Sequence, residues 1–220
     1  RLIDSTRGTV ELEGRDLTTL SAAQMEDVRG ARMAMVFQDP LSSLNPVKRV
    51  GEQIATVLRL KLGLSHRAAY TRAGDLLNDV AIRDPARVYA LYPHEVSGGM
   101  GQRIMIAMMV ITDPDVIIAD EPTSALDVSV RRQVLNVLEE LVSERDLGLL
   151  FISHDLNLVQ HFCDRVLVMY AGRVMESLAA ADLARAEHPY TRGLLSALPS
   201  LDYPRSRLPV LQRDPLWLTH

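Results

Sequence analysis

Two adjacent carboxylates end an apolar run in the sequence VIIADEPTSALD, residues 116–127. The run Val116–Ala119 predicts a parallel strand buried on both faces, and ligands bind beyond the carboxyl ends of such strands. Side chains alternate along a strand, so Asp120 and Glu121 can take different roles. Asp120 can bind Mg²⁺, directly or through water, and Glu121 can orient and deprotonate an attacking water. The pair fits phosphoryl transfer to water, although acids at a solvated turn would give the same pattern.

A second candidate element is EVSGGMGQR, residues 95–103, which places Ser97, Gly98 and Gly99 directly before a predicted helix. The N–H groups of a helix N-terminus bind anions, and glycines let a phosphate approach the backbone closely. A plain helix cap, with Ser97 as the N-cap residue, is the alternative.

Two more polar side chains follow apolar runs. His154 follows LLFIS, and Gln38 ends MAMVFQ. At the same sheet edge as the acids, His154 could bond a γ-phosphate or the attacking water, although a lone histidine is usually structural. Gln38 could bind Mg²⁺ or water through its amide oxygen.

The elements that must position these residues alternate between strand and helix. This order is typical of an α/β fold with a largely parallel sheet. The sequence predicts strands over 9–13, 33–37, 116–119, 149–152 and 166–169, and helices over 21–29, 100–111 and 128–143, with a helical period from 50 to about 80. Ala171-Gly172 predicts a hairpin turn, and the stretch after Pro199 an extended tail.

The helical block interrupts the strand order, so we interpret it as an inserted subdomain. The predicted organisation is an α/β core over 1–46 and 113–178, a helical subdomain over 47–112, and a C-terminal helix with its tail over 179–220.

Composition limits the function classes. The 220 residues are 47% hydrophobic and 24% charged, as in ordinary globular proteins. A formal net charge of −4 provides no general attraction to nucleic acid. The single cysteine, Cys163, is expected to be a small apolar helix residue. No apolar run approaches the roughly 18 residues that span a bilayer.

In combination, VFQDP, SGGM followed by QR, VIIADEPTSALD and FISHD resemble the ATP-binding subunit of ABC transporters, from about residue 8 to residue 198. The resemblance implies a P-loop NTPase (RecA-like) core with ATP and Mg²⁺ as cofactors. It implies a Q-loop glutamine at Gln38, the signature motif at Ser97, Gly98 and Gly99, the Mg²⁺-binding Walker B aspartate at Asp120, the general base at Glu121, the D-loop at Ser124–Asp127 and the switch histidine at His154.

The resemblance also implies partners. In this family two ATP-binding subunits enclose two ATP molecules, and each signature motif contacts the ATP of the other subunit. Expected partners are therefore a second ATP-binding subunit, the membrane subunits and, indirectly, an extracytoplasmic solute receptor, with no nucleic acid. The expected location is the cytoplasmic face of the inner membrane.

Two longer segments narrow the branch. VFQDPLSSLNP and EHPYTRGLLSALPSL resemble bacterial importers of oligopeptides, dipeptides and nickel. EHPYT could also begin an ordinary amphipathic helix. Many members of that branch carry a cysteine-rich C-terminal tail for an iron–sulfur cluster, and we expect none here. The transported solute is not encoded in these residues.

The sequence departs from the family in two places. Met100 stands where many members have glutamine, and no G-x-x-x-x-G-K-[ST] phosphate loop occurs in the 220 residues. Because the chain begins at Arg1, we expect a fragment whose N-terminal strands and phosphate loop are missing, with that loop within about ten residues upstream. The fragment alone is expected to bind ATP weakly and to be inactive.

Two alternatives remain open. One is an ABC ATPase that acts on DNA or ribosomes; such proteins generally carry long insertions, and this chain has a short helical block. The other is a non-catalytic interaction module, against which stands the presence of both Glu121 and His154.

Overall fold

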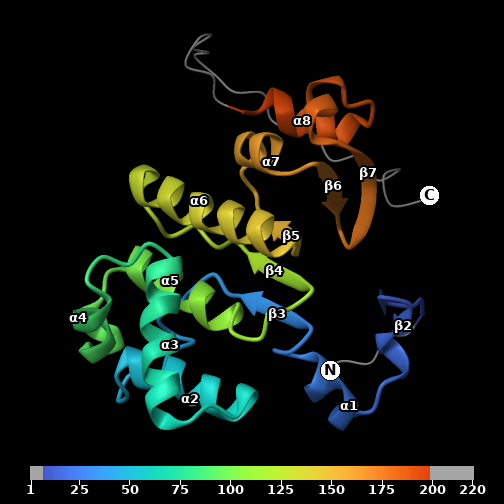
Figure 1. Cartoon of the computed structure of the whole chain (residues 1–220). Helices are drawn as coiled ribbons and strands as arrows, with labels where there is room; N and C mark the ends of the chain where they lie inside the picture. Colours follow the sequence, from blue (N-terminus) through green and yellow to red (C-terminus); the bar gives the residue numbers. More distant parts are fainter. Residues whose placement is uncertain (1–6, 199–220) are drawn as a thin grey trace. The chain divides into compact units, whose positions relative to one another are not determined.

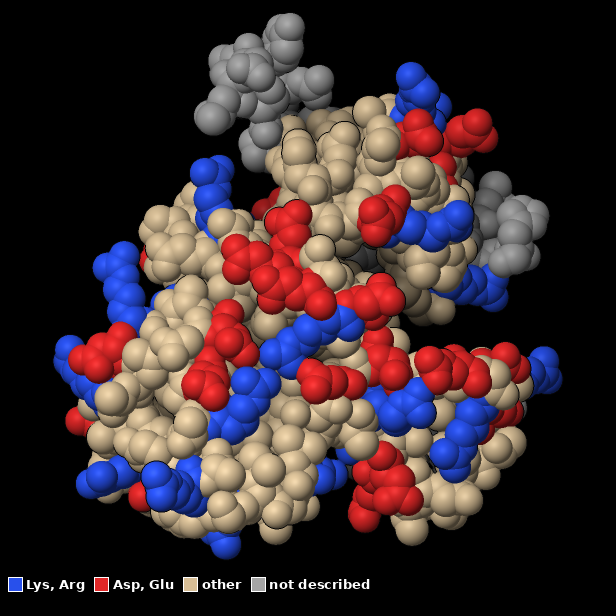
Figure 2. All heavy atoms as spheres, in the orientation of Figure 1, with Lys and Arg blue, Asp and Glu red and all other residues tan. Residues whose placement is uncertain are grey.

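The structure, a computed structural model, describes residues 7–198 and divides the chain into two compact units, Arg1–Ile152 and Ser153–His220 (Figure 1). Each unit is described by itself. The predicted tail after Pro199 lies outside the described residues. On the face drawn in Figure 2, acidic and basic side chains lie interspersed over both units.

A parallel sheet forms the centre of the first unit, in the order β3-β4-β5. Its strands are β3 (Met33–Val36), β4 (Val116–Asp120) and β5 (Gly148–Ile152). Val36 pairs with Ala119, and Asp120 pairs with Ile152. The three strands confirm the sequence prediction, and because they run parallel, the residues that follow them meet at one edge.

Helices make up the segment between β3 and β4. They are α2 (Val50–Leu62), α3 (His66–Asp79), α4 (Pro85–Ala90), the 3₁₀ turn η2 (Pro93–Glu95) and α5 (Gly98–Met109). The predicted helical stretch from 50 to 80 is divided at Gly63, which adopts a left-handed φ of 65°. Ser65 then caps α3 by accepting a hydrogen bond from Ala68 N–H. That the segment 47–112 forms a separate subdomain stays a prediction.

The long helix α6 (Val128–Arg145) connects β4 to β5 and packs on α5. Its buried face carries the predicted apolar residues Val134, Val137, Leu138 and Leu141. The apolar period therefore identified this helix correctly.

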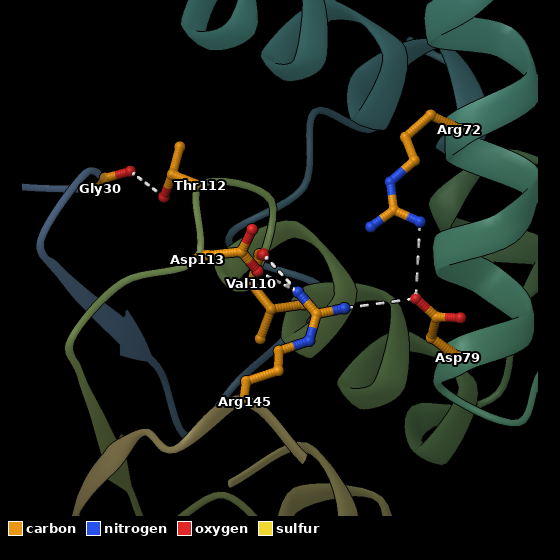
Figure 3. Close-up of polar contacts among 7 residues, drawn as sticks. All are labelled: Gly30, Arg72, Asp79, Val110, Thr112, Asp113 and Arg145. Carbon is orange, nitrogen blue, oxygen red and sulfur yellow. Dashed lines mark hydrogen bonds and ion pairs between the residues drawn. The ribbon is translucent and has the colours of Figure 1, made fainter.

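Arg145, at the last turn of α6, joins three segments of the first unit (Figure 3). Its guanidinium donates to Val110 O at the end of α5 (3.1 Å) and to the carboxylate of Asp113. It also reaches Asp79 at the end of α3 (3.3 Å), and Arg72 lies 3.9 Å from the same carboxylate. Arg145 thus ties the C-terminal ends of α3 and α5 to that of α6.

The N-terminal part of the first unit is a small hairpin followed by helices. Its elements are β1 (Glu11–Leu12), β2 (Arg15–Asp16), η1 (Leu17–Thr19) and α1 (Ala22–Val28). The predicted strand over 9–13 is shorter, because Glu13 (φ 48°) and Gly14 (φ 75°) turn the chain back on itself. The helix predicted over 21–29 is confirmed as α1, and Ser21 caps it in a capping box with Gln24.

The second unit contains α7 (Leu156–Phe162), β6 (Arg165–Tyr170), β7 (Arg173–Ala179), η3 (Ala180–Arg185) and α8 (Pro189–Ser196). Strands β6 and β7 pair antiparallel, and their turn residues Ala171 (φ 47°) and Gly172 (φ 81°) both have positive φ. This geometry confirms the predicted hairpin. Helix α7 was not among the predicted elements. Cys163, expected to be a helix residue, is instead the C-cap residue of α7 and has an extended backbone, so that expectation was wrong.

The segment EHPYT fastens α8 to the hairpin. His188 is the N-cap residue of α8, and its ring accepts a hydrogen bond from Tyr190 N–H (3.1 Å). The carboxylate of Glu176, on β7, accepts N–H bonds from Glu187 (2.7 Å) and His188 (3.3 Å). Desolvation raises the pKa of Glu176, but the nearby Thr191 hydroxyl and these two N–H bonds outweigh it, and the pKa is lowered. The motif that marked the branch in the sequence therefore has a structural role here.

Candidate functional site

The carboxyl edge of the parallel sheet brings Asp120 and Gln38 onto neighbouring strands. Asp120 is the last residue of β4 and is half-buried, and Gln38 follows the end of β3 by two residues and is exposed. Because Val36 pairs with Ala119, Asp120 lies one residue and Gln38 two residues beyond that pair, at the same edge of the sheet. The sequence placed them at this edge, and the structure agrees.

Glu121 leaves the strand in a different way from the one predicted. Strand β4 ends at Asp120, and Glu121 takes a left-handed conformation (φ 44°), so the strand alternation does not extend to it. Its N–H donates to Ile152 O (3.0 Å), and its carbonyl accepts from both the N–H and the hydroxyl of Ser124 (3.2 and 3.1 Å). The two acids therefore diverge because of the turn and not because of the pleat.

A cavity of about 360 Å³ opens in the first unit next to these residues. It is lined by Gln38 to Leu41, Gly98, Gln102, Pro122, Ala125 and Leu126. The cavity thus brings together three segments that the sequence had singled out separately: the end of β3, the start of α5 and the turn after β4.

Ser97 and Gly98 begin α5 at the surface. Ser97 is the N-cap residue, and its hydroxyl accepts from Met100 N–H (3.4 Å). Both Ser97 and Gly98 are exposed. The capping alternative is therefore correct, and contact of this exposed helix N-terminus with a nucleotide stays a prediction.

Gly99 differs from its neighbours because it is buried. A Cβ added there would stand 2.1 Å from the Cγ1 atom of Val130 on α6, far inside van der Waals contact. The same construction at Gly98 meets Leu126 at 3.5 Å, which is an ordinary contact. The absence of a side chain at Gly99 therefore serves helix packing, and the approach of a phosphate to its backbone stays a prediction.

Sequence reasoning gave no role to Gln102. This amide is 1% exposed on α5, and its Nε2 lies 3.5 Å from Phe37 O at the end of β3. A polar residue on the apolar face of a predicted helix was the signal that could have identified it.

Asp127 caps α6. Its carboxylate accepts N–H bonds from Val130 (3.0 Å) and Ser129 (3.1 Å) and a hydroxyl bond from Ser129 (2.8 Å). The bond from Val130 N–H and those from Ser129 lower the pKa of Asp127. Two of the predicted nucleotide contacts, Ser97 and Asp127, are thus N-cap residues of adjacent helices.

His154 belongs to the second unit, where it lies exposed between β5 and α7. The flanking residues shape its loop: Asp155 N–H donates to the Ser153 hydroxyl (3.1 Å), and the Asp155 carboxylate caps α7 through Leu158 N–H (3.1 Å). The catalytic role of His154 stays a prediction.

The chemistry of these donors fits Mg²⁺ bound together with a nucleotide. Among the described residues no group of three or more His, Cys, Asp or Glu side chains could hold a metal. Mg²⁺ on nucleotides commonly takes only one or two protein carboxylates, with phosphates and waters as the other ligands. Asp120 and Gln38 offer a carboxylate and an amide oxygen of that kind.

Comparison with known proteins identifies the family. The family described as ABC transporter matches residues 1–124. The match covers more than half of the chain, so this protein belongs to the ABC transporter family.

The relatives and solved structures agree with this assignment. A Brucella abortus protein named as a peptide import ATP-binding protein is 48% identical over 206 residues, 93% of this chain and 62% of that protein. The glutathione import ATP-binding protein GsiA of Escherichia coli is 47% identical over 206 residues, 90% of this chain and 33% of that protein. The ATP-binding cassette MJ0796, solved as a dimer with ADP and Pi, superposes with a TM-score of 0.72 at 25% identity, covering 81% of this chain and 76% of that one.

These matches show the fold of an ABC ATPase cassette, a mixed α/β fold with a parallel sheet. The chain spans about 62% of the length of the Brucella relatives. None of the described helices combines the length and apolarity needed to cross a membrane.

Proposed function

We propose that the whole protein is the ATP-hydrolysing subunit of a bacterial importer, with peptides as the solute class. The observation that carries this proposal is the grouping of Asp120, Glu121 and Gln38 at one edge of a parallel sheet, beside the open N-terminus of α5. The names of the Brucella and Escherichia relatives supply the solute class. Nickel and other small solutes are outcomes that a transport assay can return.

In this proposal each residue has one task. Asp120 and Gln38 hold Mg²⁺, which neutralises the phosphate charge when it is bound. Glu121 takes a proton from the attacking water, and His154 bonds the γ-phosphate or that water. Ser97, Gly98, Gly99 and Asp127 contact the nucleotide that is held by a second ATP-binding subunit, and Gly99 also provides the close packing of α5 on α6.

The proposed setting follows the family. A RecA-like P-loop core with its helical subdomain works at the cytoplasmic face of the inner membrane, next to the membrane subunits. A solute receptor outside the membrane acts only indirectly, and no nucleic acid takes part. Capture of the full-length protein by membrane subunits supports this setting, and capture by ribosomes instead would replace it with the non-transport alternative.

The direct test is Glu121→Gln in the full-length protein, measured by ATP binding and by steady-state hydrolysis. We expect binding to persist and hydrolysis to fall about 10²–10⁴-fold, because only the water-activating carboxylate is lost. Glu139→Gln, an exposed position on α6, is the matched control for the change in charge. Hydrolysis within a few-fold of wild type in Glu121→Gln would exclude Glu121 as the base.

A further inference from the structure

The start of α5 and the start of α6 meet at one residue, Val130. A Cβ added at Gly99 would lie only 2.1 Å from the Cγ1 atom of Val130, so the Val130 side chain occupies the space that a Gly99 side chain would need. The backbone N–H of Val130 donates to the Asp127 carboxylate at 3.0 Å. Val130 therefore contacts the signature segment (residues 97–103) through its side chain and the turn after β4, at Asp127, through its backbone.

A second contact beside the first strengthens the connection. Leu126, directly before Asp127, lies at van der Waals distance from the position of a Gly98 side chain (3.5 Å). Gly99 follows the Ser97 cap of α5 by two residues, and Val130 follows the Asp127 cap of α6 by three. The two helix N-termini thus pack directly on each other without a layer of side chains on the α5 side.

We infer that Val130 seated on Gly99 makes the signature segment and the Asp127 turn move as one rigid body, with Gly99 as a positioning residue. This inference rests on the proposed function, in which Ser97 and Asp127 serve the same nucleotide. A side chain at position 99 pushes α6 away from α5, which separates the two capping residues although neither is changed.

The test is a set of four full-length proteins: wild type, Gly99→Ala, Val130→Ala and the double variant. Truncating Val130 removes the clashing Cγ1 atom and leaves its Cβ at 3.5 Å from the new methyl, an acceptable contact. Gly101→Ala is the matched control, since the only close approach of its Cβ would be to the terminal Cδ2 methyl of Leu41, at 2.9 Å, which can rotate away, while Leu41 Cγ and Pro40 Cγ would lie at an ordinary 3.6 Å.

The first readout is independent of activity. Gly99→Ala should lower the melting temperature by about 5 °C, a typical result of overpacking in a chain of this size. It should increase amide hydrogen exchange in residues 97–103 and 127–133 together, and the double variant should restore both. Increased exchange in residues 97–103 alone, or no recovery in the double variant, would overturn the inference.

The second readout is ATP hydrolysis. Gly99→Ala should lower kcat about 10- to 100-fold with a change in KM below about threefold, because Asp120, Gln38 and Glu121 at the sheet edge are unchanged. The double variant should recover kcat. Recovery of the melting temperature without recovery of kcat would mean that position 99 needs glycine for the ligand, and the inference would fail. A wild-type protein without ATPase activity would refute the proposed function, while melting and exchange would still decide the packing inference.

Discussion

Replacing Arg145 with methionine removes the guanidinium that joins the ends of three helices and keeps most of the aliphatic stem. The side chain is only 18% exposed, so its contacts are partly shielded from solvent. The change removes the bond to Val110 O at 3.1 Å, the ion pair with Asp113 and the contact with Asp79 at 3.3 Å.

The three lost contacts do not weigh equally. Asp113 is 71% exposed, so its pair is worth less than about 1 kcal/mol, and Asp79 keeps Arg72 at 3.9 Å. The bond from a charged donor to Val110 O is worth about 1–2 kcal/mol, since the same carbonyl still accepts a longer bond from Asp113 N–H (3.3 Å). The total is about 2 kcal/mol, which lowers the melting temperature by about 4–8 °C.

Thermal unfolding followed by circular dichroism measures this effect in the full-length protein. Arg72→Met is the control, because it removes only the 3.9 Å surface pair with Asp79 and should cost about 0.5 kcal/mol. If the two variants melted at the same temperature, the Arg145 guanidinium would not hold the helix ends together and the estimate above would be refuted.

Two further predictions concern stability. Glu176→Gln should lower the melting temperature at pH 7, and the difference from wild type should vanish on acidification. The folded pKa of Glu176 lies below its ordinary value of 4.5, so its contribution is complete above that pH and is lost as the pH falls through the folded pKa. A difference that persists at pH 2–3, well below about 4.5, would contradict this assignment. Gly74→Ala, in open space on α3, should stabilise the fold by about 0.5–1 kcal/mol. Gly51→Ala should destabilise it by about 1–3 kcal/mol, because the added Cβ would stand 2.0 Å from the Tyr89 ring. The reverse order of the two melting temperatures would contradict this account of the packing around α2 and α3.

The sequence predicted the elements whose signals are local. The three parallel strands, α6 and the β6–β7 hairpin each carry a period or a turn signal within their own residues, and the structure confirms them. The break at Gly63 was missed, although Gly63 followed by Ser65 is a stop and a start signal two residues apart. Helix α7 was also missed, although Asp155 is an N-cap signal directly before it.

The sequence could not predict contacts between distant segments. Gly99 and Val130 are 31 positions apart, so nothing local distinguishes a glycine that admits a phosphate from one that admits a valine. The left-handed backbone conformation of Glu121 was not predictable either, because glutamate does not favour that conformation. The positions of Asp120 and Gln38 were predictable, because parallel strands bring their carboxyl ends to one edge.

The left-handed backbone of Glu121 is unfavourable for folding, at a residue for which a catalytic task is proposed. The other described non-glycine residues with positive φ are all exposed, whereas Glu121 is half-buried and directly follows a core strand. Holding glutamate in this conformation costs about 1–2 kcal/mol, which glycine would avoid and asparagine would reduce. A chain that had drifted into a purely architectural role would gain stability by replacing Glu121. A glutamate at this position is therefore a cost to folding, and the role of general base proposed for Glu121 is a reason for keeping it.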